Sequence, residues 1–273
     1  MSGAPPTGHG DDQDLTIAVP NALAVRYAAR SWTLVYCTDD TRTWRIEDGS
    51  TTRFVKVVRT AAYPTLAATA ARLRWAGQWL PVPAVVDVGR DDCGEWLVTT
   101  ALAGRDLTRQ DPSVEPRRLV EHFAHALRQF HDRAPVGACP FEFTVDVAIA
   151  HVRARIDAGL VDPDRDFQPE HRHLSAHGAL AELERLRPDR EDLVVCHGDY
   201  CPPNVIVAAD EVNGYVDLGE LGVSDRWRDV AMGTWSTTWN FGAGYEDLFL
   251  AVYGAEPDDQ RGAFYRLLHE VVS

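Results

Sequence analysis

The stretch VVCHGDYCPPNVIV, residues 194–207, points both to a fold and to a chemical site. Two short apolar runs of strand type enclose a polar segment that contains His197, Asp199 and Asn204. The two adjacent prolines cannot continue a strand ladder, so we expect the polar segment to be a loop between two strands. Because the apolar runs bury both ends of this loop, its polar side chains are expected to face a site rather than form an exposed hairpin.

Two further side chains extend this pattern. Asp217 follows Asn204 by thirteen residues, in the strand-like VDLG, and can face the same point across a hairpin. Lys56 lies in the strand-like RFVKVVR and is the only lysine among the 27 basic residues. An ammonium group is a compact point charge, which phosphate-binding lysines exploit, so Lys56 is a candidate phosphate ligand.

These residue types are the ones that phosphoryl transfer from a nucleotide to an alcohol requires. The reaction needs a carboxylate that orients the acceptor, oxygen ligands for Mg²⁺ and a cation on the phosphates that stay behind. Asp199 supplies the first, Asn204 and Asp217 supply oxygen ligands that suit a hard metal ion, and Lys56 supplies the cation. The pattern therefore predicts a nucleotide- and magnesium-dependent small-molecule kinase.

The sequence before residue 100 differs in character from the sequence after it. The first part has strand-like runs and one Ala-rich helical segment at residues 66–80, which ends at Pro81. The second part consists mainly of segments with helical apolar spacing, at residues 117–131, 145–159, 175–187, 225–238, 245–253 and 258–272.

This division predicts an α+β fold. We expect a small antiparallel-sheet, nucleotide-binding lobe at residues 19–100, a hinge at residues 101–104, and a larger, mainly helical lobe at residues 105–273 that carries the catalytic loop and the acceptor site. Residues 1–18 have neither a basic start nor an apolar run, so they are interpreted as a disordered leader and not as a signal peptide.

Composition excludes several classes of function. The apolar content of 45% and charged content of 25% are typical of a soluble globular protein, and no apolar run is long enough to span a membrane. A net charge of −14 argues against nucleic acid and anionic membranes as partners, and suits a cationic small molecule. The five cysteines form no CxxC pair, which argues against zinc and disulfides and favours the cytoplasm. A monomer is expected, and a dimer remains open.

From about residue 19 to its end, the chain resembles the aminoglycoside O-phosphotransferases, antibiotic-resistance kinases with a bilobal, protein-kinase-like fold. The resemblance is carried by FVK, LPVPAVV, WLVTTALAG, CPF, HGDYCPPNVIV, GYVDLGELGVSDRWRDVA and AFYRLLHE. It implies transfer of the γ-phosphate of ATP, with GTP as the alternative donor, to an aminoglycoside hydroxyl. That hydroxyl is the 3′ group of a kanamycin- or neomycin-type acceptor or the 3″ group of a streptomycin-type acceptor, and the transfer confers resistance.

The resemblance also implies roles for individual residues. Asp199 is the implied catalytic base, Asn204 and Asp217 are the implied Mg²⁺ ligands, and Lys56 is implied to bind the α- and β-phosphates. The remaining implied roles are bracing of the catalytic loop by His197, Asp225 and Asp229, and nucleotide binding by Thr41, Thr43 and the backbone at Thr100 and Leu102.

The chain departs from the family pattern at three places. Thr69 stands where the family has a helix glutamate that pairs with the lysine. The phosphate-covering loop, CTDDTRTW at residues 37–44, contains no glycine, so we expect weaker nucleotide affinity. At the acceptor site, His269 replaces a family aspartate, Glu220 stands where the family commonly has arginine, and Glu270 is retained. A streptomycin-type acceptor is therefore as open as a kanamycin-type one.

A polycationic acceptor is expected to meet several carboxylates at once, because each exposed ion pair contributes only about 0.2–1 kcal/mol. The candidates are Asp162, Asp164, Asp166, Glu170, Glu220 and Glu270. For residues 162–170, a solvated acidic loop without a binding role is an equally good interpretation. Trp235 and Trp239, four residues apart on one helix, are expected to pack in the core.

Two alternatives to aminoglycoside phosphorylation remain open at this point. One is a kinase of the same fold that acts on another metabolite or antibiotic. The other is a catalytically weak or silent relative that binds ligands without turnover, as Thr69 and the loop without glycine would allow.

Overall fold

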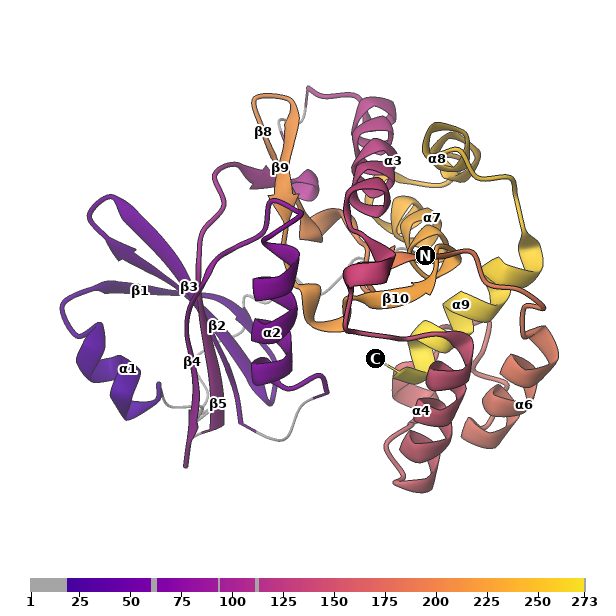
Figure 1. The fold of residues 1–273 in the computed structure, drawn as a ribbon, viewed down its shortest axis with the longest axis horizontal. Coiled ribbons are helices and arrows are strands. Elements are labelled where there is room, and N and C mark those ends of the chain that lie inside the picture. The colour runs from indigo at the N-terminus through magenta and orange to yellow at the C-terminus, as the bar shows by residue number, and fades with distance from the viewer. Residues whose placement is uncertain (1–18, 60–62, 93, 111–112, 273) are drawn as a thin grey trace. The chain divides into compact units, whose positions relative to one another are not determined.

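The computed structural model describes residues 19–59, 63–92, 94–110 and 113–272, so the expected leader at residues 1–18 lies outside the described residues. The chain divides into two compact units between Ala103 and Gly104. In Figure 1 the first unit runs from indigo to magenta and the second from magenta to yellow. The division falls inside residues 101–104, whose hinge role stays a prediction.

The first unit is built on a five-stranded antiparallel sheet with the strand order β1-β2-β3-β5-β4. The strands are β1 (Ser31–Cys37), β2 (Thr41–Asp48), β3 (Thr51–Val58), β4 (Val85–Asp91) and β5 (Gly94–Thr100). Two helices accompany the sheet, α1 (Asn21–Arg26) and α2 (Leu66–Ala76). Thr65 caps α2 by accepting a hydrogen bond from the Ala68 N–H, and the Glu95 carboxylate accepts one from the Leu66 N–H at 2.8 Å.

Strand alternation gives this sheet two different faces. One face packs a buried cluster that includes Ile46, Val55 and Val57 against Leu23 of α1. Successive side chains of a strand point to opposite faces, so Lys56 lies on the other face from Val55 and Val57. The partner of Lys56 across the β2–β3 pair is Thr43, which shares its face.

The second unit is mainly helical. Its helices are α3 (Pro116–Arg133), α4 (Val145–Asp157), α5 (Pro163–Asp166), α6 (Ala176–Leu186), α7 (Trp227–Phe241), α8 (Glu246–Tyr253) and α9 (Asp259–Val272). Two small antiparallel sheets complete it: β7 (Leu193–Cys196) pairs with β10 (Gly222–Asp225), and β8 (Val205–Ala208) lies between β6 (Arg105–Asp106) and β9 (Glu211–Tyr215). Short 3₁₀ turns precede β8, at Pro202–Asn204, and β10, at Leu218–Glu220.

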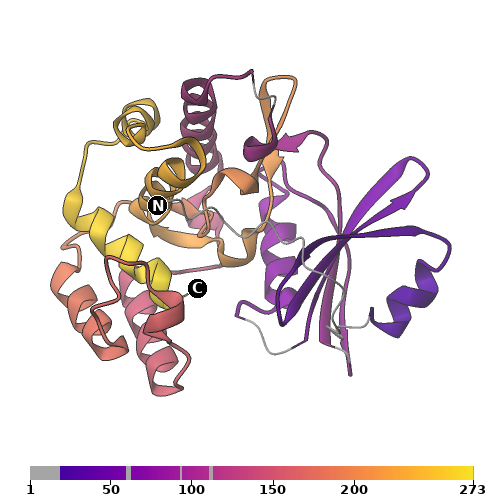
Figure 2. The same cartoon turned by 180° about the vertical axis from the view of Figure 1, so that it is seen from behind.

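Helix α7 is the centre of this unit. All of its first eleven residues, 227–237, are buried, and α3, α8 and α9 pack around it (Figures 1 and 2). Two buried tyrosines fasten the small sheets to α3: the hydroxyl of Tyr200 donates to the Phe123 carbonyl at 2.7 Å, and that of Tyr215 donates to the Ala126 carbonyl at 2.8 Å. The loop between β7 and β8 is thereby held against a rigid helical core.

The elements largely follow the sequence-based expectation, but VDLG was predicted to be a strand and is not: β9 ends at Tyr215, and Asp217 lies in the turn after it. Two short helices were also not predicted. The helices α1 and α5 were not expected, because six and four residues are too few to show helical periodicity. Trp235 is buried as expected, whereas Trp239 is 50% exposed, so the prediction of a core role is wrong for Trp239.

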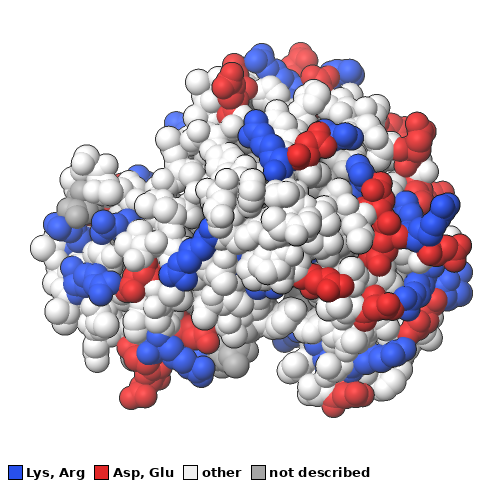
Figure 3. Space-filling view, in the orientation of Figure 1, with Lys and Arg blue, Asp and Glu red and all other residues white. Residues whose placement is uncertain are grey.

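Three features of the described residues relate to the compositional analysis. Within the described parts of the chain, no helix is both long and apolar enough to cross a membrane. Cys37, Cys139, Cys196 and Cys201 are free thiols. On the face drawn in Figure 3, acidic and basic side chains are interspersed rather than gathered into one basic patch.

Candidate functional site

The loop between β7 and β8 makes a sharp turn directly after the buried strand. Gly198 has a φ of +93°, and a Cβ added to it would lie 2.6 Å from the Cβ and the carbonyl oxygen of Glu220. Only glycine fits a position with both that backbone conformation and that close approach. The turn places the next residue, Asp199, beside the segment that joins β9 to β10.

Asp199 and Asn204 face each other across this loop. The Asn204 amide nitrogen donates to the Asp199 carboxylate oxygen at 3.1 Å and to the Asp199 carbonyl at 2.9 Å. Because both partners of that nitrogen are acceptors, the orientation of the Asn204 amide is fixed. Its oxygen is therefore the atom that Asn204 offers to a metal ion, and 8% of this residue is exposed.

Asp217 is brought to the same point by a backbone hydrogen bond. The Val216 N–H donates to the Asn204 carbonyl at 3.0 Å, which sets the two predicted metal ligands side by side. Asp217 itself is exposed and has a left-handed conformation, with φ 60° and ψ 48°. Such a conformation costs a non-glycine residue about 1–3 kcal/mol and is concentrated at functional sites.

His197 links the two halves of this arrangement. Its Nδ1 accepts the Asp199 N–H at 3.3 Å, and its Nε2 bonds the Val216 carbonyl at 2.9 Å. A carbonyl only accepts, so Nε2 is the donor in this bond. The ring is fully buried and packs against Phe130 and Tyr200. The predicted bracing role of His197 is thus supported by two bonds, one to each side of the site.

Asp229 anchors the backbone of the loop from the first turn of α7. Its two carboxylate oxygens accept the His197 N–H at 2.6 Å and the Gly198 N–H at 2.9 Å. Burial by itself would raise the pKa of Asp229, but the hydrogen bond from His131 and those from the loop outweigh it and hold this pKa below its usual value. Asp229 is therefore an ionised, buried anchor.

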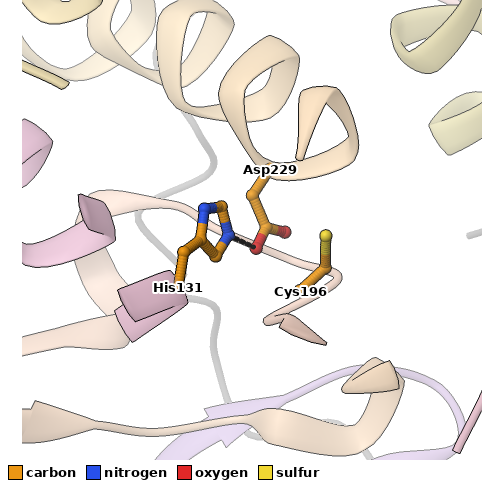
Figure 4. A group of neighbouring side chains, drawn as sticks. All are labelled: His131, Cys196 and Asp229. Carbon is orange, nitrogen blue, oxygen red and sulfur yellow. Dashed lines mark hydrogen bonds and ion pairs between the residues drawn. The ribbon is translucent and has the colours of Figure 1, made fainter. Parts of the chain in front are cut away.

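The anchor continues into a chain of buried hydrogen bonds. His131, at the end of α3, bonds Asp229 through Nε2 at 3.0 Å and the Tyr253 hydroxyl through Nδ1 at 2.8 Å (Figure 4). Arg226 donates to the same Tyr253 hydroxyl at 3.2 Å. Sequence analysis missed His131 and Tyr253, because they lie 98 residues before and 24 residues after Asp229, and only the fold brings them together.

His131, Cys196 and Asp229 are of metal-ligating types, and their ligand atoms lie within 4.8 Å of one another (Figure 4). Both imidazole nitrogens and both carboxylate oxygens, however, already have protein partners. Burial raises the pKa of the Cys196 thiol well above its usual value, so that a thiolate is disfavoured. The trio is a structural anchor rather than a metal centre.

Asp225 supports the start of α7. It is fully buried, and its carboxylate accepts the Trp227 N–H at 2.8 Å and the Asp192 N–H at 3.0 Å. Burial raises its pKa, and these two backbone hydrogen bonds oppose the change. These bonds hold the start of α7 and the Asp192 backbone, and the predicted role of Asp225 in bracing the catalytic loop stays a prediction.

The residues predicted to bind nucleotide belong to the first unit. Thr41 and Thr43 share the Lys56 face of the sheet, since they lie two residues apart on β2 and Thr43 pairs with Lys56. Arg42 points to the opposite face, where it is 3% exposed and donates to the Thr41 carbonyl at 3.0 Å and to that of Thr38. Arg42 therefore bonds back to the backbone of the loop at residues 37–44 and lies on the face opposite to Lys56.

Two further positions of this unit bear on nucleotide binding. Thr69 is buried, and its hydroxyl donates to the Thr65 carbonyl at 3.1 Å, so that this turn of α2 presents no carboxylate. The Thr100 N–H donates to the Ala84 carbonyl at 2.9 Å, and the contact of the backbone at Thr100 and Leu102 with adenine stays a prediction. Leu102 follows in the half-buried segment after β5.

The candidate acidic residues at positions 162–170 engage mainly one another's backbone. Asp162 caps α5 by accepting the Asp164 N–H at 3.1 Å, and Asp166 accepts the Asp162 N–H at 2.8 Å. Asp166 also pairs with Arg165 at 2.8 Å. Asp164 and Glu170 are exposed. A role of these four residues in acceptor binding stays a prediction.

Glu270 is more buried than the other candidate carboxylates of the acceptor site. It is only 4% exposed, and its two oxygens accept the Gln168 N–H at 3.0 Å and bond His171 Nδ1 at 2.8 Å. Burial raises the pKa of Glu270, and the hydrogen bond with His171 opposes the change. In this arrangement Glu270 ties α9 to the acidic segment, and contact with an acceptor would compete with that tie.

Glu220 forms a nearly buried ion pair that sequence analysis did not anticipate. Arg228 donates to its carboxylate at 2.6 Å and to its carbonyl at 3.2 Å, while the guanidinium lies 4.0 Å from the centre of the Phe143 ring. Burial raises the pKa of Glu220 to about 7 against the opposing effect of Arg228.

Comparisons with known proteins show the family of this chain. Residues 39–265 match the model of the phosphotransferase enzyme family. An aminoglycoside 3′-phosphotransferase of Streptomyces fradiae is 41% identical over 214 residues, which cover 75% of this chain and 79% of the relative.

Solved structures give the same picture. The crystal structure of an aminoglycoside-3′-phosphotransferase of type VIII has a TM-score of 0.82 and 34% identity, covering 92% of this chain and 96% of that one. A 3″-type aminoglycoside phosphotransferase from Streptomyces rimosus, solved with ADP and streptomycin, has a TM-score of 0.76 and 29% identity, covering 92% and 97%. These likenesses confirm the predicted α+β, protein-kinase-like fold.

Proposed function

The chain belongs to the phosphotransferase enzyme family, among its aminoglycoside phosphotransferases, and we propose that it transfers the γ-phosphate of ATP to a hydroxyl group of an aminoglycoside. The acceptor hydroxyl is of the 3′ or the 3″ type, since relatives of both types are similar to this chain. The reaction confers resistance on a cell that carries the enzyme. A cytoplasmic location, where ATP is abundant, suits the free cysteines.

The observation that carries the proposal is the convergence of three oxygen-bearing side chains. Asp199 and Asn204 are joined by the 3.1 Å hydrogen bond, and Asn204 is joined to the residue before Asp217 by the 3.0 Å backbone bond. The set contains one half-buried carboxylate, one amide oxygen and one exposed carboxylate. That is the donor set that a hydrated Mg²⁺ and an alcohol acceptor require.

In this mechanism Asp199 orients the acceptor hydroxyl and receives its proton as the oxygen attacks the γ-phosphorus. Its carboxylate is held by Asn204, and its backbone is held by His197, so little ordering is needed when the acceptor binds. Asn204 and Asp217 would hold an Mg²⁺ ion, which would offset the negative charge of the phosphates. Lys56 of the first unit binds the phosphates that remain with the nucleotide.

The residues fit a magnesium ion on their chemistry. The Asn204 amide nitrogen is engaged by Asp199, which leaves the harder amide oxygen for the ion. Asp217 is exposed and held in a left-handed conformation that its neighbours impose. Oxygen ligands and access to water are what Mg²⁺ prefers, because it keeps part of its hydration shell.

The test is transfer of radioactive phosphate from [γ-³²P]ATP to a panel containing kanamycin, neomycin and streptomycin, with mass spectrometry of the products. We expect an added mass of one phosphate on at least one acceptor, and none when EDTA removes Mg²⁺. Transfer to a different antibiotic or metabolite would identify a kinase of the same fold with another substrate. Thermal stabilisation by Mg-ATP without any product would instead identify a silent relative, the role that Thr69 and the loop without glycine leave open.

A further inference from the structure

A small pocket beside the catalytic loop contains Glu220 and His269, two residues of the predicted acceptor site, but the part of the acceptor that it could bind has not been specified so far. It is lined by Gly198, Glu220, Arg228, Met232, Tyr265, Leu268, His269 and Val272. Gly198 directly precedes Asp199 and is packed so closely against Glu220 that a Cβ added to the glycine would lie only 2.6 Å from the Glu220 Cβ. The pocket therefore adjoins the backbone that carries the proposed base.

Glu220 is held in this pocket without being enclosed. One of its oxygens accepts a hydrogen bond from Arg228 at 2.6 Å, but 20% of the Glu220 side chain is exposed, compared with 6% for Arg228. A carboxylate has about four acceptor positions, and a single guanidinium bond occupies one of them. Glu220 thus keeps accepting capacity that a ligand can reach, while Arg228 is sealed behind it.

The charges at the pocket do not balance. Burial, helped by Asp199 and Asp217 and opposed by Arg228, raises the pKa of Glu220 to about 7, so the carboxylate is only partly ionised near neutral pH. His269 adds no compensating charge, because burial lowers its pKa. A cation bound beside Glu220 would favour its ionised form and would offset the negative charge that Glu220, Asp199 and Asp217 place around Arg228.

The lining favours an ammonium substituent over a metal ion as that cation. Among the lining residues Glu220 is the only carboxylate, whereas Mg²⁺ and Ca²⁺ require several oxygen ligands. Met232, Leu268 and Val272 provide an apolar wall that suits the carbon framework around an amine. The pocket is also too small for a sugar ring, so a substituent of the ring is what it can take.

We propose that Glu220 binds an ammonium group of the acceptor and selects aminoglycosides that carry an amino group on the carbon next to the reacting hydroxyl. The proposal rests on the function proposed above. Because Gly198, the residue before Asp199, packs directly against Glu220, a substituent next to the reacting hydroxyl is the part of the acceptor that we assign to Glu220. The substrate class comprises 2′-amino acceptors and 2″-methylamino acceptors, whose methyl group the apolar wall accommodates.

Kanamycin A and kanamycin B test this directly, because they differ only in a hydroxyl or an amino group beside the 3′-hydroxyl. We expect the wild-type enzyme to have a kcat/KM at least about tenfold higher for kanamycin B, the loss typical of one missing charge-assisted contact. Glu220→Gln keeps the shape of the side chain and an acceptor for Arg228. It should lower kcat/KM for kanamycin B by about tenfold or more and change that for kanamycin A by less than about threefold.

Streptomycin gives a second arm, since a methylamino group neighbours its 3″-hydroxyl. There the Glu220→Gln loss should appear in KM, whereas a displaced catalytic loop would lower kcat. Glu184→Gln, a surface change on α6 that breaks only an ion pair with Arg153, is the matched control, and melting temperatures verify that both variants fold. Equal losses for both kanamycins, or a loss in kcat alone, would overturn the proposal.

Failure of the subsite and failure of the proposed function are separable by binding. If the wild-type enzyme phosphorylates none of these acceptors, the proposed function fails. Isothermal titration calorimetry of the two kanamycins then decides about the subsite. A tighter binding of kanamycin B that Glu220→Gln abolishes supports the ammonium pocket, while equal affinities, or no binding of either, reject it.

Discussion

The catalytic loop at residues 197–204 and the acidic segment at residues 162–170 differ in where the hydrogen-bond partners of their polar groups come from. In the loop, the polar groups bond to partners from distant elements: Asp229 on α7 holds the backbone and His197 spans to Val216. In the acidic segment, Asp162 and Asp166 bond within their own turn, and Glu170 is exposed. Distant elements therefore fix the loop before a substrate binds, whereas the segment is held only by its own turn and presents exposed charges. Substitutions in the loop should reduce activity more than substitutions in the segment.

The largest effect is expected at the base of the loop. Asp199→Asn keeps the size of the side chain but removes the group that receives the acceptor proton, so kcat should fall by about 10²–10⁴-fold. Affinity for Mg-ATP, measured by calorimetry, should stay within a few fold, because the nucleotide is held by other residues. Asp210→Asn, an exposed change in the β8–β9 turn, is the matched control and should leave turnover unaltered. If Asp199→Asn turned over normally, Asp199 would not be the proton acceptor, and substitutions in the loop would matter no more than those in the acidic segment.

The next largest effect is expected for the hydrogen-bonded anchor of His131, Asp229 and Tyr253, which holds the backbone of the catalytic loop. His131→Ala deprives the buried Asp229 carboxylate and the Tyr253 hydroxyl of a partner at once. We expect the free energy of unfolding, measured with urea, to fall by about 2–5 kcal/mol, because an unpaired buried charge is costly. His177→Ala, on the exposed side of α6, serves as the control and should cost less than about 0.5 kcal/mol.

Tyr253→Phe separates the two halves of that anchor. It removes only the hydrogen bonds of the hydroxyl with His131 and Arg226 and leaves the bond between His131 and Asp229. The loss should be about 1 kcal/mol, and a His131→Ala loss no larger than this would mean that Asp229 does not depend on His131.

The sequence alone predicts the loop well because its information is local. His197, Asp199 and Asn204 lie within eight residues between two apolar strands, and Asp217 follows on the next hairpin, so spacing suffices to bring them together. The partners of Asp229 could not be predicted in this way. His131 ends an amphipathic helix and lies beside Asp229 only because α3 and α7 pack together.

The same limit explains what was missed elsewhere. Alternation along β2 places Thr43 with Lys56, but whether Arg42 would reach phosphates depended on which face the core covers. Similarly, a charged residue such as Glu270 is expected at the protein surface. It is buried instead, and His171 and the Gln168 N–H form hydrogen bonds with its carboxylate. Burial of a charged side chain is decided by partners far away in the sequence, which periodicity does not report.

Glu220 is neither held by several distant partners, as the catalytic loop is, nor exposed, as the acidic segment is. The pH dependence of the free energy of unfolding should show this intermediate position. The pKa of Glu220 in the folded protein is raised to about 7, chiefly by burial and against Arg228, with Asp199 and Asp217 adding to the rise. A raised pKa means that stability is full below the unfolded pKa of about 4.5 and is lost as the pH rises through about 7. Glu220→Gln lacks this loss.

The expected result is a stability difference between Glu220→Gln and the wild type that grows in favour of the variant from pH 4.5 to pH 7. The change should reach up to about 3 kcal/mol in the free energy of unfolding and then level off. Urea denaturation at several pH values measures it. A difference that is constant over this range would show that the carboxylate stays ionised throughout, as in an exposed segment.

The smallest effects are expected in the acidic segment itself. Asp164→Asn and Glu170→Gln each remove one exposed charge, worth about 0.2–1 kcal/mol, so the KM for an aminoglycoside should rise by less than about fivefold. The rise should shrink further as salt is added, because exposed charges are screened. Asp132→Asn, an exposed change on α3, provides the background value. A rise of more than about tenfold from either single substitution would mean that the segment holds the acceptor as specifically as the loop holds Asp199, since screened surface charges cannot supply that much binding energy.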